Sequence, residues 1–168
     1  LIKVDSADLS QPIANARFRI EAVDGSWGPE EYTTSEDGTI DLSKLPVGAY
    51  VVTELECPGY VIDEAQRIIH LDGNETAQFV FTNSKLPSLH LTKISADGSP
   101  LAGVTYSLTR IEDGSRYMDQ TTSSTGTIVW DGLQPGVYSL RETDTLSDHI
   151  LDPKEYHVEL FPGKDGTI

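Results

Sequence analysis

Two glutamates close nearly identical phrases in this chain, and a lysine precedes each of them at a similar distance. Residues 45–54 read LPVGAYVVTE and residues 133–142 read LQPGVYSLRE, so Glu54 and Glu142 are separated by 88 residues. Lys3 and Lys93 lie 51 and 49 residues ahead of these glutamates. The chain is therefore predicted to be a tandem repeat in which each copy carries one lysine and one glutamate at equivalent places.

The first copy also contains an asparagine, Asn83, with which this pair could react. Burial raises the pKa of a carboxyl group and lowers that of an ammonium group, and a neutral amine is a nucleophile. If the three side chains met in a core, the Lys3 amine would attack the side-chain carbonyl of Asn83 while Glu54 carried the proton. One ammonia would leave, and the product would be an isopeptide bond between the two side chains.

Side chains alternate between the two faces of a strand, and this alternation is expected to point these polar side chains into the core. Residues i, i+2 and i+4 of a strand share one face, so each polar side chain continues an apolar row. Buried together they would be costly unless they met. The ordinary alternative remains open, because a lysine near a strand end often reaches water and a strand glutamate often faces solvent. The rows are Leu1/Lys3, Tyr50/Val52/Glu54, Phe79/Phe81/Asn83, Leu89/Leu91/Lys93 and Tyr138/Leu140/Glu142.

Strand patterns and turn residues dominate the chain, and no stretch keeps a helical apolar period over three turns. The pattern allows a short helical turn at 61–66 or 144–150. It predicts two tandem all-β sandwiches, residues 1–85 and 86–168, with a short, stiff join at residues 83–87, where Pro87 breaks pairing. The expected strands are 1–5, 16–23, 30–34, 49–56, 66–71 and 76–82, then 88–95, 104–111, 116–122, 137–143 and 155–160.

Composition argues against several classes of function. The net charge of −15 argues against nucleic acid as a partner, because phosphate binding needs a basic face. No apolar run is long enough to cross a bilayer, so we expect no membrane insertion of this segment. Cys57 is the single cysteine, and the four histidines lack ligand spacing, so neither an intrachain disulfide nor a metal site is expected. We expect no cofactor.

Taken together, these phrases resemble the Cna-B or SpaA-type prealbumin-like domains of Gram-positive surface proteins and pilins. The resemblance rests on the two glutamate phrases, on the openings LIKVD at residues 1–5 and LTKIS at 91–95, and on FVFTN at 79–83. It covers essentially the whole chain. It implies an immunoglobulin-like sandwich, an extracellular, cell-wall-attached location, and a Lys3–Asn83 isopeptide bond promoted by Glu54.

The second copy departs from that pattern. Lys93 and Glu142 match the family's lysine and glutamate, but the spacing from Glu54 to Asn83, applied after Glu142, gives position 171, beyond Ile168. The last strand is expected to begin after Ile168, so the acceptor for Lys93 is expected to be absent from residues 1–168. The segment reads as an excised part of a larger polypeptide.

The resemblance implies a structural role as stalk or shaft modules of a bacterial adhesin or pilin, rigidified by isopeptide bonds that form once. The expected partners are neighbouring domains of the same surface protein. The alternative is an adhesin module that binds a host extracellular protein or glycan through its loops. Exposed aromatics on a concave surface would favour that alternative, but the two tryptophans, Trp27 and Trp130, lie far apart in sequence. A multi-turnover enzyme is not expected.

Overall fold

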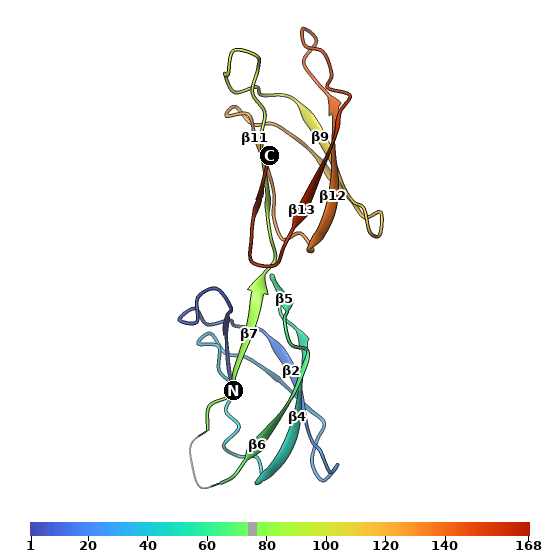
Figure 1. The fold of residues 1–168 in the computed structure, drawn as a ribbon. Helices are drawn as coiled ribbons and strands as arrows, with labels where there is room; N and C mark the ends of the chain where they lie inside the picture. The colour runs from blue at the N-terminus through green and yellow to red at the C-terminus, as the bar shows by residue number, and fades with distance from the viewer. Residues whose placement is uncertain (74–76) are drawn as a thin grey trace. The chain divides into compact units, whose positions relative to one another are not determined.

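The structure is a computed structural model that describes residues 1–73 and 77–168. The chain forms two compact units, Leu1–Lys85 and Leu86–Ile168, hereafter domain 1 and domain 2 (Figure 1). The regular elements in the described ranges are all strands, which confirms the predicted all-β class. None of the described residues forms a helix with the length and apolarity needed to cross a membrane.

Domain 1 is built from two sheets. In the first sheet the first and last strands of the domain run parallel and side by side, with Lys3 opposite Phe81 and Asp5 opposite Asn83. Its order is β1 (Ile2–Asp5), β7 (Val80–Lys85) and β5 (Tyr60–Ile62). The second sheet is antiparallel, with the order β3 (Glu30–Thr33), β2 (Arg17–Ala22), β4 (Gly48–Glu56) and β6 (Gln66–Leu71).

Domain 2 repeats this arrangement with a shorter last strand. The antiparallel sheet has the order β10 (Arg116–Thr121), β9 (Thr105–Arg110), β12 (Gly136–Asp144) and β13 (Glu155–Leu160). The other sheet has the order β11 (Thr127–Trp130), β8 (Leu89–Thr92) and β14 (Gly166–Thr167). β14 pairs in parallel with β8, as β7 does with β1, so it takes the place of β7 in domain 2.

Alternation along the strands forms each core. In β2 the side chains of Phe18 and Ile20 are fully buried while their neighbours reach the surface. The tyrosines of the repeated phrases, Tyr50 and Tyr138, are buried as well. Each donates a hydrogen bond from its hydroxyl to the backbone carbonyl four residues earlier, at 2.7 and 2.6 Å. These bonds fix the turn ahead of β4 and β12, the strands that carry the glutamates.

The structure differs from the sequence-based expectation at a few short elements. Strands β5 and β11 were not predicted, and the segment 61–66 begins in β5 rather than in a helical turn. Segment 144–150 holds only a hydrogen-bonded turn, in which the His149 amide donates to the Leu146 carbonyl. The strand expected at 76–82 spans 80–85, and residue 76 lies outside the described residues. In domain 2 the strand that pairs with β8 as β7 pairs with β1 is β14, which starts at Gly166, three residues earlier than expected.

Candidate functional site

The backbone of each candidate lysine is held by the same local structure. The Lys3 amide donates to the Gly38 carbonyl at 2.8 Å, and the Lys93 amide donates to the Gly126 carbonyl at 2.8 Å. Both glycines have a positive φ, 74° and 73°, and a side chain on either would collide with the lysine carbonyl. Glycine is therefore required at both turns, and it places the two lysines equivalently in their strands.

Domain 1 brings Lys3, Glu54 and Asn83 together in its core. Lys3 Nζ donates to Glu54 Oε2 at 2.9 Å, and Asn83 Nδ2 donates to Glu54 Oε1 at 2.7 Å. Lys3 and Asn83 have no exposed surface, and Glu54 is 4 % exposed. One carboxylate therefore holds an amine and a carboxamide beside each other, in a site closed to water.

The carbonyl end of the asparagine amide has its own partner. The backbone amide of Asp63 donates to Asn83 Oδ1 at 3.2 Å. This places a fixed hydrogen-bond donor at the atom that becomes negatively charged if the amide carbon is attacked. The orientation of the amide follows from both contacts, because only this orientation gives its nitrogen and its oxygen complementary partners.

Apolar side chains surround this triad. The Lys3 ammonium lies 5.9 Å from the centre of the Phe18 ring, which itself packs edge-on against Phe81 at 5.5 Å. Burial raises the pKa of the nearby Cys57 thiol to about 11, so this thiol is protonated at neutral pH. A buried ion pair gains little net stability over an apolar core, so the pair is more readily explained by chemistry than by stability.

Domain 2 contains the same ion pair with different neighbours. Lys93 Nζ donates to Glu142 Oε2 at 2.8 Å, and the Tyr106 hydroxyl donates to the same oxygen at 3.1 Å. The backbone amide of Asp152 points to Glu142 Oε1 at 3.4 Å. These two donors lie around a carboxylate whose counterpart in domain 1 binds Asn83. The structure therefore places Lys93 and Glu142 together as it does Lys3 and Glu54, but with no carboxamide bound to Glu142.

A cavity of about 230 Å³ opens beside Lys93, and the lysine side chain is 23 % exposed. The cavity is bounded by Leu91, Tyr106, Tyr156 and Ile168, among others. The β14–β8 register places Thr167 opposite His90, so a continued strand would place position 172 opposite Ser95. In domain 1 the residue opposite the equivalent Asp5 is Asn83. The cavity thus lies beside β14, and the position that would pair with Ser95, as Asn83 pairs with Asp5, is 172.

Burial alone would lower the pKa of Lys93, but the pKa of this lysine is raised. Burial lowers the pKa of Lys93, but its hydrogen bond to Glu142 and the neighbouring Tyr106 outweigh burial, so the pKa is raised. Burial is also the main reason that the pKa of Tyr106 rises to about 12. In this state Lys93 is a charged ammonium rather than a nucleophilic amine.

Three contributors to these sites were not found from the sequence. Tyr106 stands at the position of Phe18, 88 residues later, so the repeat itself could have drawn attention to the exchange of a phenyl for a phenol. Asp63 and Asp152 contribute through backbone amides, which leave no signal in residue type. No three His, Cys, Asp or Glu side chains cluster as metal ligands in the described ranges.

The chain is similar to a known protein family and to several solved structures. The SpaA family, described as a prealbumin-like fold domain, matches residues 1–85 and again residues 87–168. No curated protein sequence shows a significant match. The shaft pilin SpaA of Lactobacillus rhamnosus GG, solved as a double mutant, is similar with a TM-score of 0.54 and 13% identity over 93% of this chain and 86% of that one.

Two further solved structures are similar over the full length at lower TM-scores. The Bacillus anthracis TIE protein gives 0.49 with 24% identity, covering 99% of this chain and 32% of that one. A streptococcal ancillary pilin gives 0.48 with 19% identity, covering 100% of this chain and 60% of that one. The chain thus spans less than two thirds of the length of either protein. The family matches confirm the resemblance inferred from the sequence: the chain belongs to the SpaA family of prealbumin-like fold domains and contains two of them.

Proposed function

We propose that domain 1 cross-links itself through an isopeptide bond between Lys3 Nζ and the side-chain carbonyl carbon of Asn83, promoted by Glu54. The observation that carries this proposal is the bridging carboxylate, whose two oxygens accept hydrogen bonds from the amine and from the carboxamide. Both reactants are buried and bound to the same carboxylate, so their effective concentration is high.

The proposed reaction needs only groups present in the site. Glu54 takes a proton from the Lys3 ammonium, and the resulting amine attacks the Asn83 carbonyl carbon. The Asp63 amide stabilises the negative charge that develops on Asn83 Oδ1. Glu54 then delivers its proton to Asn83 Nδ2, the bond from the carbonyl carbon to Nδ2 breaks, and ammonia leaves. The attacking nitrogen gives its second proton to the Glu54 carboxylate, which leaves a neutral amide between the two side chains. Domain 1 reacts once, so this is self-modification rather than enzymatic turnover.

The bond would join the first strand of the domain to the last. Because Lys3 lies in β1 and Asn83 in β7, tension applied along the chain would pass through the cross-link and bypass residues 4–82. Closing a loop of about 80 residues is worth ~4–5 kcal/mol by the chain-entropy account of cross-linking. We therefore assign the chain a structural role, as stalk or shaft modules of an adhesin or pilin on the Gram-positive cell surface, with neighbouring domains of the same protein as partners.

Intact mass spectrometry tests the bond directly. The expected mass is that of the sequence less one ammonia, and digestion should release a branched peptide that contains Lys3 and Asn83. A correctly folded protein with the full sequence mass would contradict the proposal. Loss of two ammonias would show that domain 2 also reacts, against the geometry found at Lys93.

A further inference from the structure

The aspartate whose backbone amide faces Asn83 is also bound, through its side chain, to the next residue of the same strand. The Asp63 amide donates to Asn83 Oδ1 at 3.2 Å, and the Ser84 hydroxyl donates to Asp63 Oδ2 at 3.1 Å. Asn83 and Ser84 are consecutive in β7, so Asp63 is tied to this strand twice, by its backbone and by its carboxylate. These two contacts are called the Asp63 clamp below.

A second hydroxyl holds the serine of the clamp. Ser6 Oγ lies 2.9 Å from Ser84 Oγ, and the Ser6 amide donates to the Asn83 carbonyl at 2.9 Å. The single hydroxyl proton of Ser84 is used on Asp63, so Ser6 is the donor between the two serines. Because successive hydroxyl bonds polarise one another, Ser6 strengthens the bond from Ser84 to Asp63.

The segment that carries the Asp63 amide has little packing of its own. Asp63 follows the last residue of β5, and residues 63–65 are exposed. The Glu54 amide donates to the Ala65 carbonyl at 2.8 Å and so holds the connection two residues further on. The distance of 3.2 Å from the Asp63 amide to Asn83 Oδ1 is at the long end of the usual range, so a small displacement would lose this bond. The position of the amide therefore depends on the clamp.

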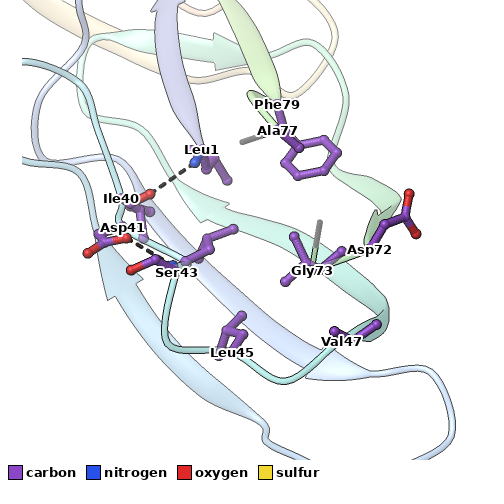
Figure 2. A pocket seen from close by; sticks show the side chains of 12 residues that line it. Leu1, Ile40, Asp41, Ser43, Leu45, Val47, Asp72, Gly73, Ala77 and Phe79 are labelled. Carbon is purple, nitrogen blue, oxygen red and sulfur yellow. Dashed lines mark hydrogen bonds between the residues drawn. The ribbon is translucent and has the colours of Figure 1, made fainter. Parts of the chain in front are cut away.

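A cavity of about 340 Å³ in domain 1 does not reach this contact. The cavity lies beside Leu1 and Phe79 (Figure 2), and the described residues that line it include neither Asp63 nor Ser84 nor a member of the triad. Direct contacts, and not a neighbouring void, therefore determine where the amide lies.

Domain 2 shows another arrangement of the same aspartate. Asp152 takes the place of Asp63, but its carboxylate accepts from the Tyr156 hydroxyl at 2.8 Å and from the Lys154 amide at 2.9 Å. The backbone amide of Asp152 points to Glu142 Oε1 at 3.4 Å. Where the carboxylate has different partners, the amide has a different acceptor.

The sequences of the two domains agree with this difference. Ala96 stands at the position of Ser6, counted from the lysine of each domain, so domain 2 has no hydroxyl there. Arg67 takes the strand position of Tyr156, and its guanidinium donates to the Val80 carbonyl at 2.7 Å. Domain 1 therefore has the supporting serine and, at this strand position, no phenol that competes for the aspartate.

We propose that Ser84 and the Asp63 carboxylate are positioning residues for bond formation, which hold the Asp63 amide at Asn83 Oδ1 with the support of Ser6. This role rests on the proposed reaction between Lys3 and Asn83. A hydrogen-bond donor stabilises the charge that develops on Asn83 Oδ1 most effectively when it is already in place. Because the clamp is open to water, its loss should slow the reaction rather than prevent it.

The rate can be measured on the whole chain from an unbonded start. Insoluble protein that shows the full sequence mass is dissolved in guanidinium chloride and diluted to refold. Samples are quenched in acid and denaturant, the fraction that has lost one ammonia is read by intact mass, and tryptophan fluorescence follows folding separately. Ser84→Ala should lose ammonia about three- to tenfold more slowly than the parent chain, the range expected of one hydrogen bond. Ser84→Thr keeps the hydroxyl and should restore the rate.

Three further variants separate positioning from a general effect on the strand. Asp63→Ala should slow ammonia loss as Ser84→Ala does, and the double variant should be no slower than the slower single one, because both changes break the same contact. Thr82→Ala is the matched control, since it removes a hydroxyl from the same face of β7 and should leave the rate unchanged. In the final folded protein, amide exchange at Asp63 should be faster with Ser84→Ala.

The outcomes distinguish the positioning role from the bond itself. Ammonia loss at the parent rate in Ser84→Ala, or equal slowing by Thr82→Ala, would overturn the positioning role and leave the bond standing. Slower ammonia loss with unchanged amide exchange at Asp63 would also overturn it, since Ser84 would then act by another route. A parent chain that folds and never loses ammonia would overturn the proposed bond, and the positioning role with it.

Discussion

Domains 1 and 2 share an ion pair but differ in the group that completes it. In domain 1 the second oxygen of Glu54 binds Asn83, whereas in domain 2 the tyrosine hydroxyl of Tyr106 and the backbone of Asp152 approach Glu142. The lysine–glutamate contact is nearly the same length in both, 2.9 and 2.8 Å. The fold of each domain therefore forms the lysine–glutamate ion pair, and only the asparagine that binds Glu54 depends on the last strand.

The comparison also separates two consequences of the last strand. With β7 in place the Lys3 side chain is wholly buried, while Lys93 is 23 % exposed beside its cavity. The strand thus supplies both the carboxamide that binds Glu54 and the cover that excludes water from Lys3. Domain 2 is an assembled but uncovered form of the site, and the following changes would break or sharpen that contrast.

Replacing Glu54 with glutamine should have the largest effect. The variant loses the promoter of the proposed bond and leaves Lys3 buried without a counter-charge, which is costly in itself. We expect the full sequence mass and a fall of at least ~4–5 kcal/mol in the free energy of unfolding of domain 1. Glu142→Gln is the matched control and should leave the mass unchanged. Asn83→Ala is a second variant that keeps the Lys3–Glu54 ion pair and so leaves no unpaired buried charge, and it should also show the full mass of its sequence.

Extending the chain beyond Ile168 should convert domain 2 into a second reactive domain. If residues 169–174 copy Val80–Lys85, the asparagine falls at position 172 and a second ammonia should be lost. The gain in stability of domain 2 should approach that of the first bond, about 4–5 kcal/mol. An aspartate at position 172 should lose water instead of ammonia, and an alanine should lose neither. Bonding with asparagine at 171 but not at 172 would contradict the register read from β14.

Exchanging the aromatic residue beside each glutamate, tyrosine for phenylalanine in domain 2 and the reverse in domain 1, should have a smaller effect. Tyr106→Phe removes a buried donor to Glu142, which should cost domain 2 ~1.5 kcal/mol in urea unfolding. Phe18→Tyr places a hydroxyl near a carboxylate that already binds Lys3 and Asn83. It should compete for Glu54 and slow bond formation, as followed by mass after rapid refolding. An unchanged rate would show that the site tolerates a third donor.

The smallest effect is a difference in alkaline stability. The pKa of Lys93 in the folded domain is raised above its ordinary value of 10.5. The stabilisation from its charged form is therefore complete below pH 10.5 and is lost as the pH rises through the folded pKa. Domain 2 should lose stability in that range, whereas a cross-linked domain 1 has no Lys3 ammonium left to titrate. Lys93→Met should abolish the part of the stability loss at alkaline pH that comes from the Lys93 ammonium.

Much of this arrangement could be predicted from the sequence because the two copies check each other. The offset of 88 residues aligned the glutamates, and the period of two in the strands placed Lys3, Glu54 and Asn83 on inward faces. Short strands such as Tyr60–Ile62 were missed, because three residues carry too little pattern to separate a strand from a loop.

Register was the other property that the sequence could not give. Spacing after Glu142 predicts an acceptor at position 171, whereas extending the β14–β8 pairing beyond Ile168 gives position 172 as the counterpart of Asn83. The difference arises between β12 and β13, where Asp152 lies ten residues after Glu142 but Asp63 lies nine after Glu54. An inserted residue in a connection shifts everything that follows, and only the hydrogen-bonded pairing reveals it.

The position of Lys3 and Asn83 at the two ends of one domain has a consequence for proteolysis. A bond between them would close residues 3–83 into a ring, and the polypeptide would enter and leave that ring at its junction. A protease that cut one exposed peptide bond inside the ring would open a loop without separating the two ends of the chain. Domain 1 would survive a nick as one covalent piece with one added water, whereas a single cut inside an unbonded domain 2 would divide the chain.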